Sequence, residues 1–229
     1  MRLTLTPPWL IADLGRPRRV LSFAPHNPGF RRARHILLRE VRNADLPEGL
    51  DAHRWLDGQL RGIGQAQSVC MMTSRPLRHY RVSRAGPVCC VATVGLGNAE
   101  RVGHRRQVPA AVETQPQPQP QPGYGTINLA ILVAEGLTET AMIEALTIAA
   151  QARTLAVLEA GIMLPSGLAT GTGTDCIALA CDGGATGFAG LHTPLGEALG
   201  RAVHDAVLAG ARDWVAAHGR IPPPTPGAA

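Results

Sequence analysis

The sequence predicts an α+β protein in which mixed β-sheets are covered by helices. Apolar runs of strand length, rich in Val, Ile, Leu and Cys, occur in both halves of the chain. Two longer segments in the second half repeat apolar residues at helical spacing, and each follows a threonine that can cap a helix. Strands and helices mixed in this way form layered folds around a shared core.

In the first half, short strands are expected at residues 18–25 and 33–41 because both are apolar runs bounded by turn residues. A helix is expected at residues 52–63, where large apolar side chains share one face. The segments "SVCMMTS" and "VCCVATVGLGN" indicate two more strands, both buried, and the second ends in a glycine-rich turn.

The second half is more regular. Residues 126–134, "TINLAILVA", form a nearly continuous apolar run, which is typical of a strand covered on both faces. A helix is expected to begin after Thr138 and to end at Gly161. The next strand is predicted in "DCIALACDG", and a last helix begins at the Thr-Pro pair of residues 193–194.

We expect one domain at residues 18–218, preceded by an N-terminal extension at 1–17 and followed by a disordered tail at 219–229. The segment "ETQPQPQPQPGYG", residues 113–125, alternates Gln with Pro and can neither pair in a sheet nor continue a helix. It predicts an extended, solvated loop. This segment either separates two domains or is inserted into one fold whose halves pair.

Composition narrows the function classes. The chain has 229 residues and 45% hydrophobic content, enough for a substantial core. Aromatic residues make up only 3%, which argues against a base-stacking surface despite the net charge of +5, so no nucleic-acid partner is expected. The five cysteines lack paired C-x-x-C spacing, which favours buried reduced thiols over disulfides or zinc.

The sequence gives no sign of a membrane segment. No apolar run reaches the roughly 18 residues that span a bilayer. Two prolines near the N-terminus interrupt any apolar run of a signal peptide. We therefore expect a cytoplasmic protein without a membrane partner.

The stretch "GLATGTGTDCIALACDG", residues 167–183, resembles a phosphate-binding loop only in its glycines. Such loops need a lysine and lead into a helix, whereas this one has no lysine and leads into a strand. From residue types it is a tight turn in which Gly171 and Gly173 adopt positive φ. The polar residues expected to cap this turn are Thr172, Thr174 and Asp175.

Several segments in order resemble one family: "FAPHNPGFRRARHILLREV", "MMTSRPLRHYRV", "VATVGLGNAERVG", "GTINLAILVAEGLTETAMIEALTIAAQARTLAVLEAG", "TGTGTDCIALACDG" and "GLHTPLGEALGRAV". Together they are similar to adenosylcobinamide amidohydrolase, the CbiZ family of cobamide salvage, over most of the chain. The Gln-Pro segment departs from the family pattern. The resemblance implies hydrolysis of the amide that joins the corrin propionyl side chain to aminopropanol, giving adenosylcobyric acid. It implies a corrinoid substrate, no cofactor and no catalytic metal.

The segments "VGLGNAERVG" and "GTINLAILVAEG" with "TGTGTDCIALA" are also similar to ornithine acetyltransferase and the DmpA-type aminopeptidases. This fainter resemblance implies an α-β-β-α sandwich. It also implies that a Thr or Ser at the start of an apolar strand becomes the nucleophile after self-cleavage.

Three residues are the catalytic candidates. Thr126 opens a strand, and its hydroxyl could be a nucleophile with its own freed α-amine as base; the alternative is an ordinary β-branched residue in a strand. Asn98 could stabilise an oxyanion, or be a turn residue. Asp175 could orient a base or bind substrate amides, or cap the glycine turn.

Five residues are candidates for substrate binding. Glu139 has an alternative explanation in the helix dipole. A histidine before the last helix could be a general base or the lower ligand of the corrinoid cobalt, or have neither role. Cys176 is expected to be a buried thiol rather than a nucleophile. The binding candidates are Thr172, Thr174, Glu135, Glu139 and His192.

Two other function classes remain open. One is a non-catalytic corrinoid-binding protein that uses the same pocket. The other is an acyltransferase or aminopeptidase of related fold. The expected partner is a small-molecule corrinoid, and a homo-oligomer remains open.

Overall fold

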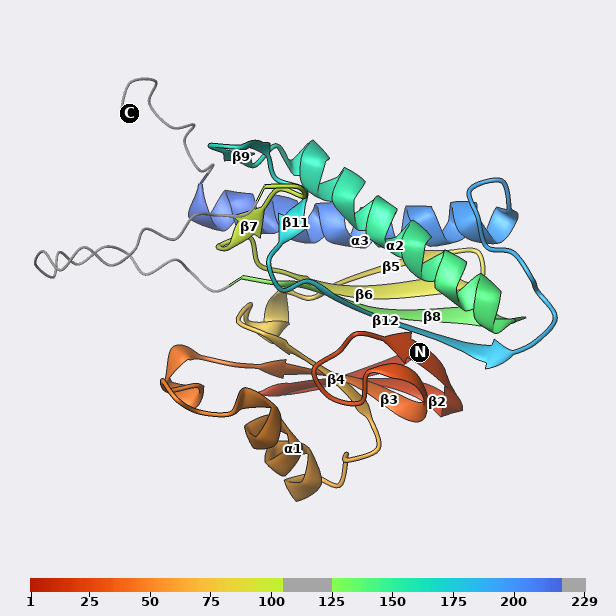
Figure 1. The fold of residues 1–229 in the computed structure, drawn as a ribbon, viewed down its shortest axis with the longest axis horizontal. Helices are drawn as coiled ribbons and strands as arrows, with labels where there is room; N and C mark the ends of the chain where they lie inside the picture. Colours follow the sequence, from red (N-terminus) through yellow and green to blue (C-terminus); the bar gives the residue numbers. More distant parts are fainter. Residues whose placement is uncertain (105–124, 220–229) are drawn as a thin grey trace, which may run out of the picture.

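The computed structural model describes residues 1–104 and 125–219. Its main sheet has eight strands in the order β4-β3-β2-β12-β8-β6-β5, with β1 paired to β2 (Figure 1). These strands are β1 (Arg2–Thr6), β2 (Trp9–Ser22), β3 (Gly29–Glu40), β4 (Val69–Thr73), β5 (Arg81–Ala85), β6 (Val88–Val94), β8 (Ile127–Leu137) and β12 (Cys176–Gly183). The α-helices of the described residues are α1 (Ala52–Gly62), α2 (Glu139–Ala160) and α3 (Pro194–His218).

Short elements lie beside this framework. The pairs of two-residue strands are β7 (Ala99–Glu100) with β11 (Gly171–Thr172), and β9 (Met163–Leu164) with β10 (Gly167–Leu168). Two 3₁₀ turns, Asn43–Asp45 and Leu77–His79, follow β3 and β4. The β7–β11 pair connects the loop after β6 to the loop before β12, which bears on the site described below.

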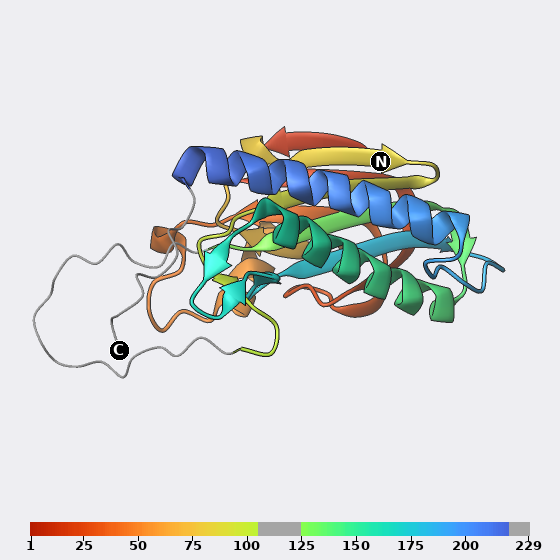
Figure 2. The same ribbon diagram turned by 90° about the horizontal axis from the view of Figure 1, so that it is seen from above.

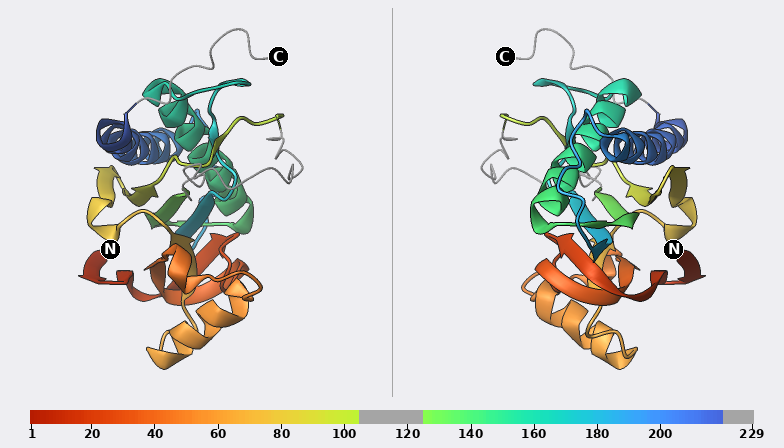
Figure 3. Two further views of the ribbon diagram at one scale, coloured as in Figure 1. Left: turned by 90° about the vertical axis from the view of Figure 1, so that its left-hand side faces the viewer. Right: turned by 90° about the vertical axis from the view of Figure 1, so that its right-hand side faces the viewer.

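The layers of the fold follow from three apolar clusters. One packs α2 and α3 against β6, β8 and β12, as in Figure 2, where the two helices lie across the sheet. A second lies between two halves of the sheet, where Ile36 and Met71 meet Ala130 and Ala178. A third packs α1 on β2, β3 and β4. The layer order is α-β-β-α (Figure 3).

The α+β class is therefore confirmed, with one difference from a pair of separate sheets. Strand β2 pairs with β12, with Val20 opposite Ala180, so the two β-layers are one continuous sheet that folds over on itself. The long β2 makes this possible, because its first half pairs with β1 and its second half with β12, while β3 runs along both. A register shift between Asp13 and Arg18 separates the two halves of β2.

The separation of residues 1–17 as an extension needs correction. These residues form β1 and the first half of β2, whose register pairs Leu5 with Leu10 and Thr6 with Trp9. Pro7 and Pro8 lie in the turn between the strands. Proline is tolerated in turns because the missing amide donor is not needed there.

Most of the Gln-Pro segment, residues 113–124, lies outside the described residues, as does the tail after Gly219. The parts before and after this segment share one sheet, because β8 and β12 lie between β2 and β6. Helix α3 also covers β5 and β6 from the first part. The described residues thus form one folded unit rather than two domains.

Helix α2 corrects the expectation that no apolar segment reaches bilayer length. It has 22 residues, and an 18-residue window has a mean hydropathy of 1.4, enough to cross a membrane by length and composition alone. Here the helix packs against α3 and the sheet. Its fully buried alanines at positions 141, 145, 149 and 156 contribute to this core, which accounts for the apolar composition.

Both caps of α2 form as expected. Thr138 accepts a hydrogen bond from the Ala141 amide at 3.1 Å, and Gly161 ends the helix in the left-handed region with φ of 71°. The helix crosses over between β8 and β12, which are parallel. Parallel neighbours need such a crossover, and the two caps fix the length of its helical part.

Close packing of α3 on β6 predicts opposite effects for two helical glycines. A Cβ at Gly210 would lie 2.7 Å from Cγ2 of Val94, whereas at Gly200 the nearest atom would be 4.0 Å away. We expect Gly210→Ala to lower the free energy of unfolding by about 1–3 kcal/mol through overpacking. Gly200→Ala should raise it by about 0.5–1 kcal/mol through helix propensity. Urea unfolding measures both, and equal effects would contradict the packing described here.

Candidate active site

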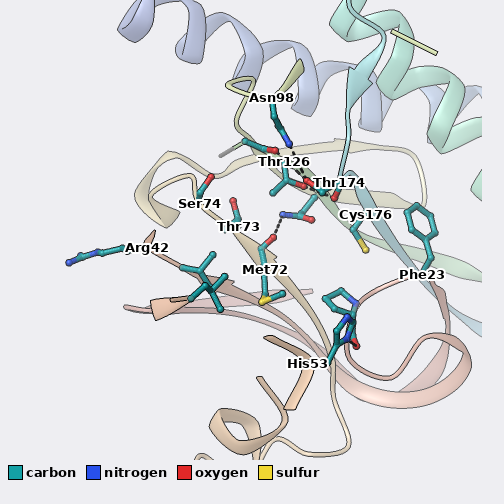
Figure 4. Close-up of a pocket in the computed structure, with 15 residues that line it drawn as sticks. Phe23, Arg42, His53, Met72, Thr73, Ser74, Asn98, Thr126, Thr174 and Cys176 are labelled. Carbon is teal, nitrogen blue, oxygen red and sulfur yellow. Dashed lines mark hydrogen bonds between the residues drawn. The ribbon is translucent and has the colours of Figure 1, made fainter. Parts of the chain in front are cut away.

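A cavity of about 420 Å³ opens at the N-terminal ends of β8 and β12 (Figure 4). Hydroxyl and amide groups line one part of it and apolar side chains line another. The hydroxyl and amide side chains are Thr73, Ser74, Asn98, Thr126, Asn128 and Thr174. The apolar side chains are those of Phe23, Pro25, Val41, Leu46 and Met72. The cavity therefore offers both a polar floor and an apolar wall.

Strand register explains why Thr126 and Thr174 meet. In the parallel pair β8–β12, Asn128 lies opposite Cys176. Thr126 is two residues before Asn128, and Thr174 is two residues before Cys176, so the two threonines lie at the same level. The Thr126 hydroxyl donates a hydrogen bond to the Thr174 carbonyl at 2.8 Å. Thr126 is 6% exposed, so this hydroxyl lies in the wall of the cavity with little contact to solvent.

A chain of hydrogen bonds surrounds Thr126. Thr174 Oγ1 donates to the Gly125 carbonyl at 3.4 Å, and Asn98 Nδ2 donates to Thr174 Oγ1 at 3.5 Å. The Gly95 amide donates to the Thr126 carbonyl at 3.0 Å. Thus Asn98 and Thr174, both predicted site residues, do lie beside Thr126.

Glycine is required at position 125 because the turn after β6 approaches closely. A Cβ there would lie 2.6 Å from the Gly97 nitrogen and 2.8 Å from the Gly95 oxygen. The "GLGN" turn and the start of β8 are therefore in backbone contact. This contact brings Asn98 to the cavity.

Asp175 lies beneath the cavity lining and organises it. Its carboxylate accepts the Ile127 amide at 3.0 Å, the Thr172 amide at 3.0 Å, and the Thr172 hydroxyl. It also accepts from Arg153 of α2 at 2.5 Å, and its side chain is only 5% exposed. Because it accepts hydrogen bonds from all of these groups, Asp175 positions β8, the glycine turn and α2 relative to one another.

The glycine turn differs from expectation. Neither Gly171 nor Gly173 has positive φ, so conformational freedom is not what selects glycine there. At Gly171 a Cβ would lie 2.5 Å from Oδ2 of Asp175, so the space taken by the carboxylate excludes a side chain. Thr172 binds Asp175 and does not line the cavity. Capping by Asp175 is present as expected.

Three predicted binding residues lie at the other end of the sheet. Glu135 is near the end of β8, about 30 Å along the strand from Thr126. Glu139, in the first turn of α2, is exposed and 3.7 Å from Arg19 Nη2. His192 is exposed in the loop before α3. These residues therefore do not line the cavity at Thr126, because β8 carries the chain away from it, and their role in substrate binding stays a prediction.

Several cavity residues were missed, and two of them, Asn128 and His53, carry functional groups of particular interest. Asn128 is 1% exposed, and its Nδ2 donates to the Met72 carbonyl at 2.8 Å. It is two residues from Thr126 on an otherwise apolar strand, so alternation could have indicated it. His53, at the start of α1, also lines the cavity. No local signal could have placed it there, because the folding of the sheet brings α1 to the site.

Cys176 lines the cavity, but its thiol is buried, as predicted. Burial raises the pKa of this thiol to about 12. The thiolate is the nucleophilic form, so this thiol stays protonated at neutral pH. Among the described residues, no cluster of three or more His, Cys, Asp or Glu side chains could hold a metal ion. The expectation that no metal is needed stays a prediction.

Removing the charge of Asp175 should destabilise the protein. We expect Asp175→Asn to lower the free energy of unfolding by about 3 kcal/mol, because it leaves Arg153 without its buried counter-ion. The matched control is Asp205→Asn, since Asp205 is 54% exposed and pairs with His204 at 3.2 Å. That change should stay below about 1 kcal/mol. Chemical denaturation tests this, and equal losses would contradict the organising role of Asp175.

Two comparisons with known proteins bear on the site. The family model described as adenosylcobinamide amidohydrolase (CbiZ) matches residues 2–219. A Halobacterium salinarum protein named adenosylcobinamide amidohydrolase is 30% identical over 167 residues. The match covers 69% of this chain and 65% of that protein's own length. This chain belongs to the adenosylcobinamide amidohydrolase (CbiZ) family of enzymes.

Proposed function

We propose that this enzyme hydrolyses the amide between the corrin propionyl side chain and aminopropanol in adenosylcobinamide, in cobamide salvage. The products are adenosylcobyric acid and aminopropanol. The observation that carries the proposal is the Thr126 hydroxyl in the cavity wall, beside the side chains of Asn98 and Thr174. The family match and the relative's name support the choice of substrate.

The lining of the cavity suits part of a corrinoid. Its volume of about 420 Å³ lies near the lower end for drug-sized ligands, so it would hold the reacting side chain and one region of the ring. Threonine, serine and asparagine groups can hydrogen bond to the amide side chains of a corrin. The ionisable residues in the lining are Arg42, His53 and Cys176, and of these Arg42 carries a permanent charge. The largely neutral lining therefore matches a substrate recognised through amides.

In the proposed reaction, Thr126 Oγ attacks the carbonyl carbon of the substrate amide. The carbon–nitrogen bond breaks, aminopropanol leaves with a proton, and water then hydrolyses the ester on Thr126 to release the acid. Asn98 Nδ2 is the proposed donor to the developing oxyanion. Asp175 acts as a positioning residue through the Ile127 amide.

The base in this proposal is the α-amine of Thr126 itself. Among the described residues, the Thr126 hydroxyl donates its hydrogen bond to the Thr174 carbonyl, which cannot act as a base. Attack of Thr126 Oγ on the Gly125 carbonyl would shift that acyl group from nitrogen to oxygen, and water would then cleave the ester and free the amine. Thr174 Oγ1 already donates to this carbonyl, which supports the first step.

Replacing Thr126 tests the nucleophile. Thr126→Ala should reduce kcat for adenosylcobinamide hydrolysis by at least about 1,000-fold, whereas Thr126→Ser keeps a hydroxyl and should retain measurable turnover. Liquid chromatography with mass detection follows both products. The control is Thr147→Ala, because Thr147 is a threonine of α2 outside the cavity.

Each outcome separates the function classes. Wild-type turnover by Thr126→Ala would exclude this nucleophile. Corrinoid binding without any product from the wild type would indicate the binding-protein class. Turnover of amino-acid amides in place of the corrinoid would indicate the aminopeptidase class.

Self-processing has its own test. Intact-mass measurement of an active preparation should show two fragments, one that ends at Gly125 and one that begins at Thr126, because the free amine of Thr126 is the proposed base. The Thr126→Ala variant should remain one chain. An active preparation that contains only the full chain would rule out self-processing and leave the amidohydrolase assignment standing.

A further inference from the structure

His53 lies on the other side of the cavity from the proposed nucleophile. Figure 4 shows His53 below Met72, with Thr126 and Asn98 toward the opposite end. His53 is exposed and lines the cavity, whereas His192, a candidate ligand of the corrinoid cobalt, does not line it. The cavity thus carries one imidazole, and its role in the reaction is unassigned.

The tautomer of His53 follows from its hydrogen bond. Nδ1 lies 3.1 Å from the Pro25 carbonyl oxygen. A carbonyl can only accept, so Nδ1 carries the proton and donates it. In the neutral ring the lone pair is then on Nε2, which has no hydrogen-bond partner within the described residues. Metal-binding histidines commonly have this arrangement, with the second nitrogen held by a carbonyl.

The support beneath His53 is rigid. Asp51 caps α1 and accepts the amides of His53 and Arg54, each at 3.1 Å. Leu56 and Leu60 of α1 are fully buried against the sheet. The loop that carries Pro25 is fixed as well, because Asn27 Nδ2 donates to two carbonyls of the segment before β4 at 3.0 and 2.8 Å.

An arginine adds to the attachment of α1. The guanidinium of Arg39 in β3 lies between the rings of Trp9 and Trp55, at 5.2 and 5.0 Å. Burial lowers the pKa of Arg39, and the two aromatic faces stabilise its positive charge. Trp55 follows His53 by two residues, so the start of α1 is held directly.

We propose that His53 Nε2 binds the cobalt of the corrinoid at its lower axial position. This inference rests on the proposed function, because it takes the corrinoid to be bound in this cavity. A nitrogen–cobalt bond forms with the imidazole lone pair, any water at that position leaves, and the oxidation state of cobalt is unchanged. Imidazole suits such a metal, whereas the Cys176 thiol stays protonated.

The chemistry of the substrate makes the two sides of the cavity complementary. In a complete cobamide, the propionyl side chain carries a nucleotide whose base reaches the lower face of cobalt. The scissile amide and the lower coordination site are therefore on the same face of the ring. A corrinoid held by His53 on that face would direct this side chain into the cavity, where Thr126 lies. The apolar wall of Phe23, Pro25 and Met72 would contact the ring.

Electron paramagnetic resonance of bound cob(II)inamide tests the inference. An axial nitrogen-14 splits the cobalt hyperfine lines into triplets, and protein labelled with nitrogen-15 converts them into doublets. We expect this splitting in the wild type, its loss in His53→Ala and His53→Gln, and its retention in His192→Ala. The dissociation constant for cob(II)inamide should rise at least about tenfold in the His53 variants.

The outcomes separate this inference from the proposed function. Bound cob(II)inamide without nitrogen splitting in the wild type, or splitting that survives both His53 substitutions, would overturn the inference. Hydrolysis of adenosylcobinamide is measured on the same preparations. Hydrolysis without nitrogen splitting would support the proposed function and overturn the cobalt ligand. Splitting without hydrolysis would support His53 as the cobalt ligand and overturn the proposed function. His53 is exposed, so its variants should fold, and a thermal melt checks this.

Discussion

The parallel pairing of β8 with β12 is the constraint on which the rest of the structure depends. It sets the first residues of the two strands side by side, and it requires a crossover, which α2 supplies. The residues just before the strands, Thr126 and Thr174, are therefore neighbours although 48 positions separate them. Asp175 makes this arrangement specific, because its carboxylate joins the start of β8, the glycine turn and α2. A shift of one residue in the register would turn the site threonine away from the cavity.

The cavity combines two kinds of surface from different parts of the chain. Its polar groups come mainly from segments around the central pair, such as Asn98, Thr126 and Asn128. Its apolar wall and its imidazole come from the layer formed by β2, β3, β4 and α1. These surfaces face each other because the sheet folds over between β2 and β12. In the proposals above, one surface carries out bond cleavage and the other holds the ring, so binding and chemistry depend on separate layers.

The sequence predicted local features better than long-range ones. Thr138 and Gly161 identified the ends of α2 because caps act within one turn of a helix. Thr126, Asn98 and Thr174 belong to turns and strand ends that do meet. Glu135 and His192 lie away from the cavity, and the sequence could not show this because composition does not indicate at which end of a strand a site lies. His53 was missed because only the folding of the sheet brings α1 to the cavity. Residues 1–17 were misassigned because a pair of prolines can either mark the boundary of a sheet or form the turn between two of its strands. The local sequence does not distinguish these cases.

The continuous sheet also has a consequence for how the protein is made. Its joining strands come from opposite ends of the chain, as the contact between Arg16 and Asp182, 166 positions apart, shows. Non-local contacts of this kind must overcome a large loop-closure entropy before they form, which slows folding. During synthesis the β1–β4 layer leaves the ribosome long before β12 and α3 do. Until they arrive, the apolar face of that layer that later packs against Ala130 and Ala178 stays uncovered. The protein is thus most prone to aggregate while only this layer has been synthesised, and a chaperone that covers the exposed apolar face would act at that stage.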